Sequence, residues 1–380
     1  MSIFSTDQLG ARRRSALVHR VGWAVSATVT FALGALTLAG PALAAPASAS
    51  PGSASNVNSI IATIPVPAVG TPEFTNVDPV RGVVWTAGPS AISEISESTN
   101  QVIQTYRLID YPDAMTVDPQ TGDVLLGNTN ATLTILNGQT GAQKVVNVGT
   151  KNYFFARGVA VDPTTGLIYV TDTTLDTVSQ PGFANSMITV VNEGTGKVVD
   201  QIFDPNCADQ VTIDASTHTI YVANSNPGAT FDQGSSVWVM DEANNRVHDT
   251  IYEPSGYPDA MALDPVSDRL FIPNIYDGPL TVINTRKDQV RAEVTLPGSG
   301  LEPYPVTADS SNGMVYVDNY GSTQVYVVDE KTDAVVDTIT VPVTYGGLDV
   351  DPNRALLYQG SDLAAVNGST STVEAIKVAP

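Results

Sequence analysis

The sequence predicts an all-β protein made of seven tandem four-stranded units, the architecture of a seven-bladed β-propeller. Three observations support this prediction. A strand–turn–strand phrase recurs seven times, two further strand-like segments follow most copies, and the chain shows no helical periodicity. A repeat of about 45 residues that contains only strands is typical of propeller blades.

The recurring phrase is clearest at residues 158–172. Alternating valines lead to Asp162, a Pro-Thr-Thr-Gly turn follows, and residues 167–170 are β-branched, aromatic or leucine. An aspartate can accept hydrogen bonds from the backbone ahead of it, proline fixes φ, and glycine tolerates positive φ. The aspartate before the turn therefore marks each unit, and the markers are Asp78, Asp118, Asp162, Asp214, Asp264, Asp309 and Asp351.

The last unit is one strand short at its C-terminal end. Residues 348–350, 356–358 and 372–376 supply three strands, and the sequence ends at Pro380 without a fourth. Residues 59–67 match the pattern of the fourth strand of the sixth unit, residues 335–342. We therefore predict that the N-terminal strand completes the last blade, which closes the ring and leaves no long unpaired edge.

The N-terminal residues have the pattern of an export signal. Arg12, Arg13, Arg14 and Arg20 precede an uncharged apolar run over residues 21–39, and residues 41–44 offer a small-x-small cleavage pattern. We predict a signal peptide at 1–44, a flexible leader at 45–57 and a propeller at 58–380, in a secreted or cell-surface bacterial protein. An uncleaved membrane anchor is the alternative, and the sequence does not separate Sec from twin-arginine export.

The chain is strongly acidic, with a net charge of −21. The predicted signal, residues 1–44, contains four arginines and one acid, Asp7. The propeller without it is therefore more acidic than the whole chain. Such a surface disfavours nucleic acid and anionic lipid and suits cations or a basic partner. The single cysteine, Cys207, can form no internal disulfide and is predicted to be buried. We expect a monomer that does not insert into membranes after signal cleavage.

The loops that enter the first strands of propeller blades open around one end of the central channel. The positions five residues before the markers are mostly acidic, and Glu302 is close to one of them. These channel-mouth residues are Glu73, Asp113, Arg157, Asp209, Asp259, Glu302 and Tyr304, with Gly346 in the last unit. Asp113, Asp209 and Asp259 could together hold Ca²⁺ or another divalent cation, since hard cations prefer several oxygen ligands. The alternative interpretation is a hydrated acidic rim whose carboxylates cap turns.

Other positions carry weaker indications. Residues 173–186 and 225–235 form the longest predicted loops, in units three and four, and such loops often carry binding function. Asn128, Asp172, Asn224, Asn274 and Asn319 each follow a marker by ten residues, and their regularity favours a structural task. His218 is predicted in a turn on the opposite face and His248 between outer strands, so neither a Ser/His/Asp triad nor a histidine-rich zinc site is expected.

Residues 167–172, 219–224 and 314–319 resemble the Tyr-Val-Thr-Asn repeat. Together with the Val-Asp-Pro turns, they make the chain, over residues 58–378, similar to the YVTN family of seven-bladed propellers. The resemblance implies an exported or surface-layer-associated protein. Related lactonase-like propellers hold a divalent metal at the channel top with Glu, Asn and Asp ligands, a set that has no residue-by-residue match in this sequence.

We therefore expect an exported binding or surface-interaction protein rather than an enzyme. It would use the channel mouth and the long loops of units three and four to bind a small molecule, a glycan or a protein. The alternative is a lactonase-like, divalent-metal-dependent hydrolase or lyase with its cation held by Glu73, Asp113, Asp209, Asp259 or Glu302. The sequence identifies neither the ligand nor a substrate, nor does it show whether a metal is bound.

Overall fold

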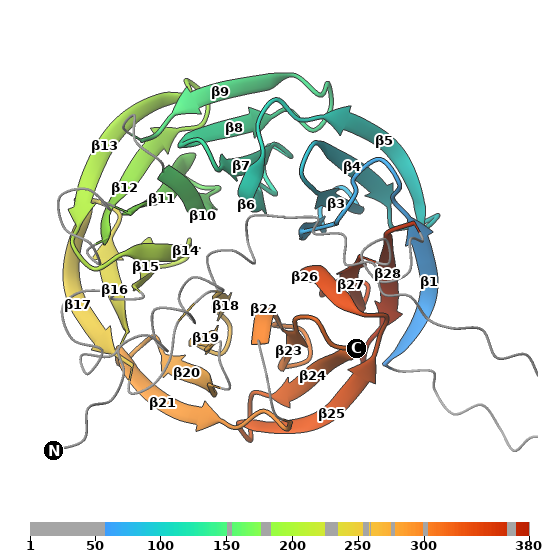
Figure 1. The fold of residues 1–380 in the computed structure, drawn as a ribbon. Coiled ribbons are helices and arrows are strands. Elements are labelled where there is room, and N and C mark those ends of the chain that lie inside the picture. Colours follow the sequence, from blue (N-terminus) through green and yellow to red (C-terminus); the bar gives the residue numbers. More distant parts are fainter. Residues whose placement is uncertain are drawn as a thin grey trace, which may run out of the picture. The chain divides into compact units, whose positions relative to one another are not determined.

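The computed structural model describes residues 58–149, 154–175, 184–224, 235–253, 258, 260–274, 278–298, 303–362 and 370–379. These residues form seven antiparallel four-stranded sheets, the predicted seven-bladed propeller (Figure 1). Residues 1–57, which contain the predicted signal peptide and leader, lie outside the described residues.

Each blade runs from an inner strand at the channel to an outer strand at the rim (Figure 1). The inner strands of blades 1 to 7 are β2 (Phe74–Asp78), β6 (Pro112–Val117), β10 (Phe154–Asp162), β14 (Ala208–Asp214), β18 (Ala262–Asp264), β22 (Pro303–Asp309) and β26 (Thr344–Asp351). The second strands are β3 (Val83–Ala87), β7 (Val124–Asn128), β11 (Leu167–Leu175), β15 (Thr219–Asn224), β19 (Arg269–Pro273), β23 (Met314–Asn319) and β27 (Leu356–Ser361). The third strands are β4 (Ala91–Ser96), β8 (Thr132–Leu136), β12 (Ala184–Asn192), β16 (Ser236–Asp241), β20 (Leu280–Asn284), β24 (Gln324–Asp329) and β28 (Thr372–Lys377). The outer strands are β5 (Gln101–Arg107), β9 (Gln143–Asn147), β13 (Lys197–Asp204), β17 (Arg246–Tyr252), β21 (Gln289–Val294), β25 (Ala334–Thr340) and, in blade 7, β1 (Ser59–Pro65).

All seven marker aspartates cap the turn after an inner strand; six are the last residue of that strand, and Asp118 directly follows β6. In each, a carboxylate oxygen accepts a hydrogen bond from the backbone N–H two residues ahead, at 2.7–3.1 Å. For Asp162 this donor is Thr164, whose hydroxyl also donates to the same oxygen at 2.6 Å. The repeated turn therefore forms for the predicted local reason, a side chain that satisfies the backbone of a tight turn.

The N-terminal strand closes the ring as predicted. β1 pairs antiparallel with β28, from Ser59 opposite Lys377 to Pro65 opposite Thr372. In Figure 1 the blue β1 accordingly lies beside the red β28 at the outer edge of blade 7. The inner strands also contact one another in an unbroken cycle, with β26 of blade 7 against β2 of blade 1. The ends of the propeller are thus joined by strand pairing.

The core lies between the blades. Ile168 and Val170 of β11 pack with Leu125 and Leu133 of blade 2, and the other clusters join neighbouring blades in the same way. The outer strands are largely exposed, and Ile103 of β5 is 54% exposed. Neighbouring blades therefore bury both faces of the inner strands of each sheet, whereas the outer strands remain largely exposed to solvent.

The predicted loop of blade 3 is shorter than expected. Residues 173–175 and 184–186 pair with each other and extend β11 and β12, because Thr173 and Thr174 favour strand conformation and find partners in Ser186 and Asn185. Residues 176–183 and 225–234 lie outside the described residues. His248 is also placed differently from the prediction: it lies within the outer strand β17 rather than between strands.

Candidate functional site

The structure places the described channel-mouth residues at the start of the inner strands. Their positions are Glu73 just before β2, Asp113 in β6, Arg157 in β10, Asp209 in β14, Tyr304 in β22 and Gly346 in β26. Asp113, Arg157 and Asp209 are buried, whereas Glu73 and Tyr304 are partly exposed. Asp259 and Glu302 lie outside the described residues, so the predicted ring is described in part.

The mouth is not uniformly acidic, because Arg157 neutralises Asp209. The guanidinium Nη1 lies 3.0 Å from Asp209 Oδ1, and both side chains are buried between blades 3 and 4. The backbone is fixed as well: Thr171 donates its hydroxyl to the Asp209 carbonyl at 2.8 Å, and Gln210 donates to the Arg157 carbonyl at 3.0 Å. A cation that is already bound to Asp209 disfavours a divalent metal ion on the same carboxylate.

Blades 1 and 2 contribute a group of two carboxylates and a phenol. Tyr111 donates its hydroxyl to Glu73 Oε1 at 2.7 Å. The pKa of Tyr111 is raised by burial and then by the charge of Glu73, with smaller contributions from Asp113 and Tyr320. The structure therefore brings Glu73 and Asp113 together around one phenol, that of Tyr111, which was not among the predicted channel-mouth residues.

At blade 7 the mouth position must be glycine. A Cβ on Gly346 would lie 2.3 Å from the carbonyl oxygen of Pro72 and 2.7 Å from that of Gly360. Real Cβ atoms do not approach backbone oxygens so closely, so Gly346 allows the backbones of blades 7 and 1 to meet. This position serves packing and supplies no ligand-binding side chain.

The residues ten positions after the markers are structural where their contacts are described. Asn274 donates to the Pro279 carbonyl at 3.1 Å and to the Thr281 hydroxyl at 2.9 Å, and Asn128 donates to Thr132 and Thr134. Asp172 accepts from the Met187 backbone at 2.9 Å. Burial raises the pKa of Asp172 to about 7, so this member of the set is a carboxyl group that can hold its proton near neutrality.

Blades 3 and 4 differ from the others at a buried position at the end of the outer strand or within two residues after it. In the other five blades this residue is buried and apolar: Val66, Leu108, Val148, Leu296 and Val341. In blades 3 and 4 it is a buried acid, Asp204 or Glu253. The backbone shows the equivalence in five blades, since the N–H of Val66, Leu108, Val148, Glu253 and Val341 each donates to the carbonyl of the residue that precedes the third strand. Asp204 instead pairs with Ser186 of β12.

These two acids accept few hydrogen bonds from the described residues. Asp204 accepts from the Asn206 backbone at 2.7 Å and Glu253 from the Ser235 hydroxyl at 3.1 Å, while their second carboxyl oxygens accept no hydrogen bond there. Burial raises the pKa of Asp204 to about 7 and that of Glu253 to about 8. A position that is apolar in the other blades is thus an acid in blades 3 and 4, the blades with the long connections after the second strand.

We expect stability to depend on pH through Glu253. Its pKa lies above the unfolded value of 4.5, so its favourable contribution is complete below about pH 4.5 and is lost as pH rises through about 8. Glu253→Leu restores the residue type of Leu108 and Leu296. Between pH 5 and 8 the variant should lose less unfolding free energy than the parent, by about 1.4 kcal/mol for each unit by which the pKa of Glu253 is raised. Urea unfolding at both pH values measures this, and an unchanged pH difference would contradict it.

Asp204 and Glu253 were not predicted, although the sequence carries a signal for them. Each precedes a proline directly after an outer strand, where other units place valine or leucine. The pairing of Arg157 with Asp209 was not predicted either, although both residues occupy the same position of their repeats. Cys207 is buried, as predicted. The described residues contain no helix long and apolar enough to cross a membrane.

No protein-family model matches the sequence. YncE of Salmonella typhi, a protein described as uncharacterized, is 23% identical over 205 residues, which cover 50% of this chain and 56% of YncE. YncE of Escherichia coli strain K12 is 22% identical over 170 residues, covering 42% of this chain and 46% of YncE. The chain therefore aligns with about half the length of these curated relatives.

The fold is similar to that of solved propellers. Hydrazine synthase of Kuenenia stuttgartiensis has a TM-score of 0.67 at 16% identity and covers 82% of this chain and 96% of its own. The WD40 repeats of RRP9 have a TM-score of 0.66 at 14% identity and cover 83% and 97%. At these identities the similarity shows the fold alone. The YVTN resemblance and the lactonase-like subtype stay predictions.

Proposed function

We propose that this β-propeller is an exported binding protein that holds a positively charged segment of a protein partner at its channel mouth. The observation that carries the proposal is the group formed by Glu73, Tyr111 and Asp113 at the start of blades 1 and 2. Glu73 and Tyr111 are partly exposed, so an incoming ammonium or guanidinium group can reach them. Carboxylates bind such groups through strong charge-assisted hydrogen bonds.

The charge of the whole chain favours the same class of ligand. A net charge of −21 attracts basic groups over distances of several ångströms and repels nucleic acid and anionic surfaces. The buried Arg157–Asp209 pair is neutral as a whole, so Glu73 and Asp113 are the acids of the described mouth that are left to attract a basic group.

The enzyme alternative receives less support from the side chains. A lactonase-like site would need several free carboxylates around one divalent ion, and Arg157 occupies Asp209, one of the three proposed ligands. Blades 3 and 4 instead support binding: Asp204 pairs with Ser186 and Glu253 accepts from Ser235, which places both buried acids near described residues that follow the long connections. Buried acids at core positions cost stability, and such exceptions to local rules gather at functional sites.

Export is part of the proposal and is supported by the sequence alone. The arginine cluster at 12–14, the apolar run at 21–39 and the small residues at 41–44 follow the order of a cleavable signal. The protein should therefore be recovered from the medium or the cell surface of the producing bacterium, with an intact mass that places its first residue near Ala45. Recovery only as the unprocessed chain from the cytoplasm would contradict this part of the proposal.

We expect Glu73→Gln combined with Asp113→Asn to weaken binding of a basic peptide about tenfold, corresponding to about 1.4 kcal/mol. The probe is a fluorescein-labelled hexa-arginine peptide, with hexa-glutamate as the negative probe, measured by fluorescence anisotropy. The two substitutions remove the charges but keep the side-chain shapes, so melting temperature should change little.

A matched control removes two charges elsewhere. Asp249→Asn combined with Asp337→Asn alters exposed carboxylates on the outer strands β17 and β25. It should leave hexa-arginine binding within about twofold of the parent, since long-range charge is screened by salt. Equal weakening in both double variants would show attraction to net charge only and would overturn the proposed site.

A further inference from the structure

On the face opposite the mouth, a repeated junction brings two carboxyl groups together. At four boundaries between blades, the marker aspartate of one blade lies against a glutamate in the turn after the third strand of the next blade. Burial raises the pKa of each glutamate, and the neighbouring aspartate raises it further. The pairs are Asp118 with Glu193, Asp162 with Glu242, Asp264 with Glu330 and Asp351 with Glu97. All eight side chains are buried. Two buried carboxyl groups in contact need a proton or a cation between them.

One junction shows how a cation is accommodated. At the boundary of blades 7 and 1, Arg354 Nη1 lies 2.7 Å from Glu97 Oε2 and 2.6 Å from Asp351 Oδ2. A single positive group therefore bridges both carboxylates from the solvent side, since the Arg354 side chain is 41% exposed. The geometry of the junction is thus suited to a bound positive charge.

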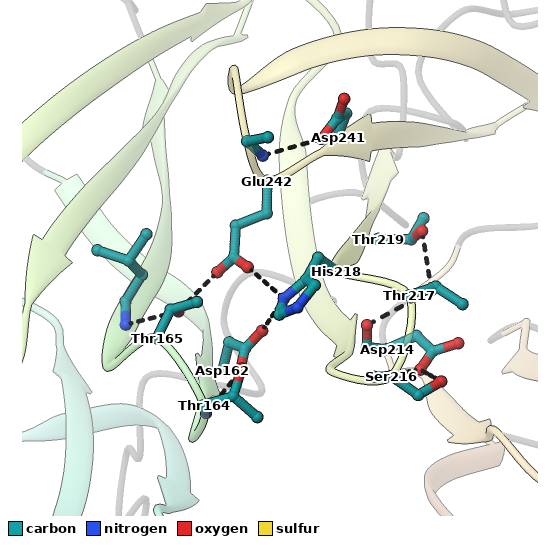
Figure 2. A network of polar contacts seen from close by, with 12 residues as sticks. Asp162, Thr164, Thr165, Asp214, Ser216, Thr217, His218, Thr219, Asp241 and Glu242 are labelled. Atoms are coloured by element: carbon teal, nitrogen blue, oxygen red, sulfur yellow. Dashed lines mark hydrogen bonds and ion pairs between the residues drawn. The ribbon is translucent and has the colours of Figure 1, made fainter.

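At the boundary of blades 3 and 4 a histidine takes this place. His218 Nδ1 lies 2.8 Å from Asp162 Oδ2 and 2.9 Å from Glu242 Oε2, and Figure 2 shows the imidazole between the two carboxylates. One nitrogen and two carboxylate oxygens all lie within 4.8 Å of one another. Among the described residues, Asp162, His218 and Glu242 are the group of three His, Cys, Asp or Glu side chains whose ligand atoms lie close enough to share a metal ion.

The second oxygen of each carboxylate is held by other donors. Thr164 donates its backbone N–H and its hydroxyl to Asp162 Oδ1, and Thr165 donates its hydroxyl to Glu242 Oε1 at 3.0 Å (Figure 2). These contacts orient the remaining oxygens toward His218. Metal-binding carboxylates are commonly oriented in this way by outer hydrogen bonds.

His218 occupies a turn position of the repeat that has positive φ in every blade. The equivalent residue is glycine in four blades (Gly82, Gly122, Gly166 and Gly313) and Asp268 or Ala355 in two others. His218 adopts the same conformation, with φ of 54°, at a cost of about 1–2 kcal/mol for a residue with a side chain. A residue that is unfavourable for the turn therefore brings a nitrogen ligand to the carboxylate pair.

We propose that Asp162, His218 and Glu242 form a binding site for a divalent transition-metal ion, with Zn²⁺ as its representative. Zinc accepts imidazole nitrogen and carboxylate oxygen at about 2.0–2.2 Å, which places tetrahedral ligand atoms about 3.3 Å apart. The two nitrogen–oxygen separations of 2.8 and 2.9 Å need to widen only slightly. The fourth position faces solvent, because the His218 side chain is 48% exposed. An imidazole ligand disfavours Ca²⁺ and Mg²⁺, which prefer oxygen alone.

Isothermal titration calorimetry of the purified chain with Zn²⁺ tests the proposal, and His218→Gly is the decisive variant. Glycine is the residue that four blades already use at this turn, so the variant should fold. We expect one Zn²⁺ per parent chain, affinity at least tenfold weaker in His218→Gly and Glu242→Gln, and no comparable binding of Ca²⁺ or Mg²⁺. Zinc should also raise the melting temperature of the parent and leave that of His218→Gly unchanged.

His248→Asn is the matched control. His248 lies on the outer strand β17, with its Nε2 4.0 Å from Asp288, and this variant should bind zinc like the parent. Zinc binding that is unchanged in His218→Gly, that is lost in His248→Asn, or that is matched by Ca²⁺ would overturn the assignment. So would the absence of zinc binding by the parent, since the site would then serve only as a hydrogen-bonded junction.

Discussion

Deletion of residues 59–67 is expected to abolish the folded propeller. The deletion removes β1, the outer strand of blade 7, and with it the ladder to β28. It also removes the buried side chains of Ile64 and Val66, each worth about 1.5–3 kcal/mol of burial. The combined loss is of the same order as the whole stability of a typical domain, about 5–15 kcal/mol.

The deletion should also leave β28 as an exposed edge. Glu374 is fully buried and accepts the Thr63 hydroxyl at 2.6 Å, so loss of β1 removes a partner from a buried carboxylate as well. Unpaired edges promote association. We expect aggregation in size-exclusion chromatography and loss of the cooperative melting transition in circular dichroism.

A chain that begins at Asn58 is the matched control for this deletion. It lacks the predicted signal and leader but keeps Asn58, whose backbone N–H donates to the Lys377 carbonyl at 2.7 Å, and the whole of β1. It should melt within a few degrees of the longer chain. A chain without residues 59–67 that melts like this control would contradict closure through β1.

Arg157→Ala is expected to destabilise the protein by about 3–5 kcal/mol, the usual effect of removing one partner of a buried ion pair. The guanidinium lies 3.0 Å from Asp209, and the exposed fractions of the two side chains are 8% and 1%. Without Arg157, the buried carboxylate loses its compensating charge at the junction of blades 3 and 4. Urea unfolding at pH 7 measures the difference.

The double variant Arg157→Met with Asp209→Asn separates charge from packing. It removes both charges and keeps most of the buried volume, so it should recover more than half of the stability lost in Arg157→Ala. If the double variant is as unstable as Arg157→Ala, an uncompensated charge on Asp209 is not the cause of the lost stability. If Arg157→Ala unfolds like the parent, the ion pair does not stabilise the junction of blades 3 and 4.

The fold could be predicted from the sequence because its information is local and repeated. Each marker aspartate satisfies the turn that directly follows it, so a contact over two residues identifies every inner strand. The closure could also be predicted, since residues 59–67 carry the pattern of the outer strands. The bounds of β11 and β12 were less certain, because Thr173 and Thr174 suit both loops and strands.

The candidate site could be predicted only in outline. Alignment of the units placed Glu73, Asp113, Arg157 and Asp209 at one end of the channel, but it could not show which side chains pair. Those pairings cross from one blade to the next, and they depend on side-chain direction as much as on position in the chain. The position of His218 was predicted, yet its contacts with Asp162 and Glu242 were not, because the three residues come from three different turns.

Closure through β1 also has a kinetic consequence. The hydrogen bond between Thr63 and Glu374 joins residues 311 positions apart, so the last sheet cannot form until almost the whole chain has been synthesised. Bringing such distant segments together carries a large loop-closure entropy, and proteins dominated by distant pairings fold slowly. Blade 7 can therefore close only after β28 has been synthesised.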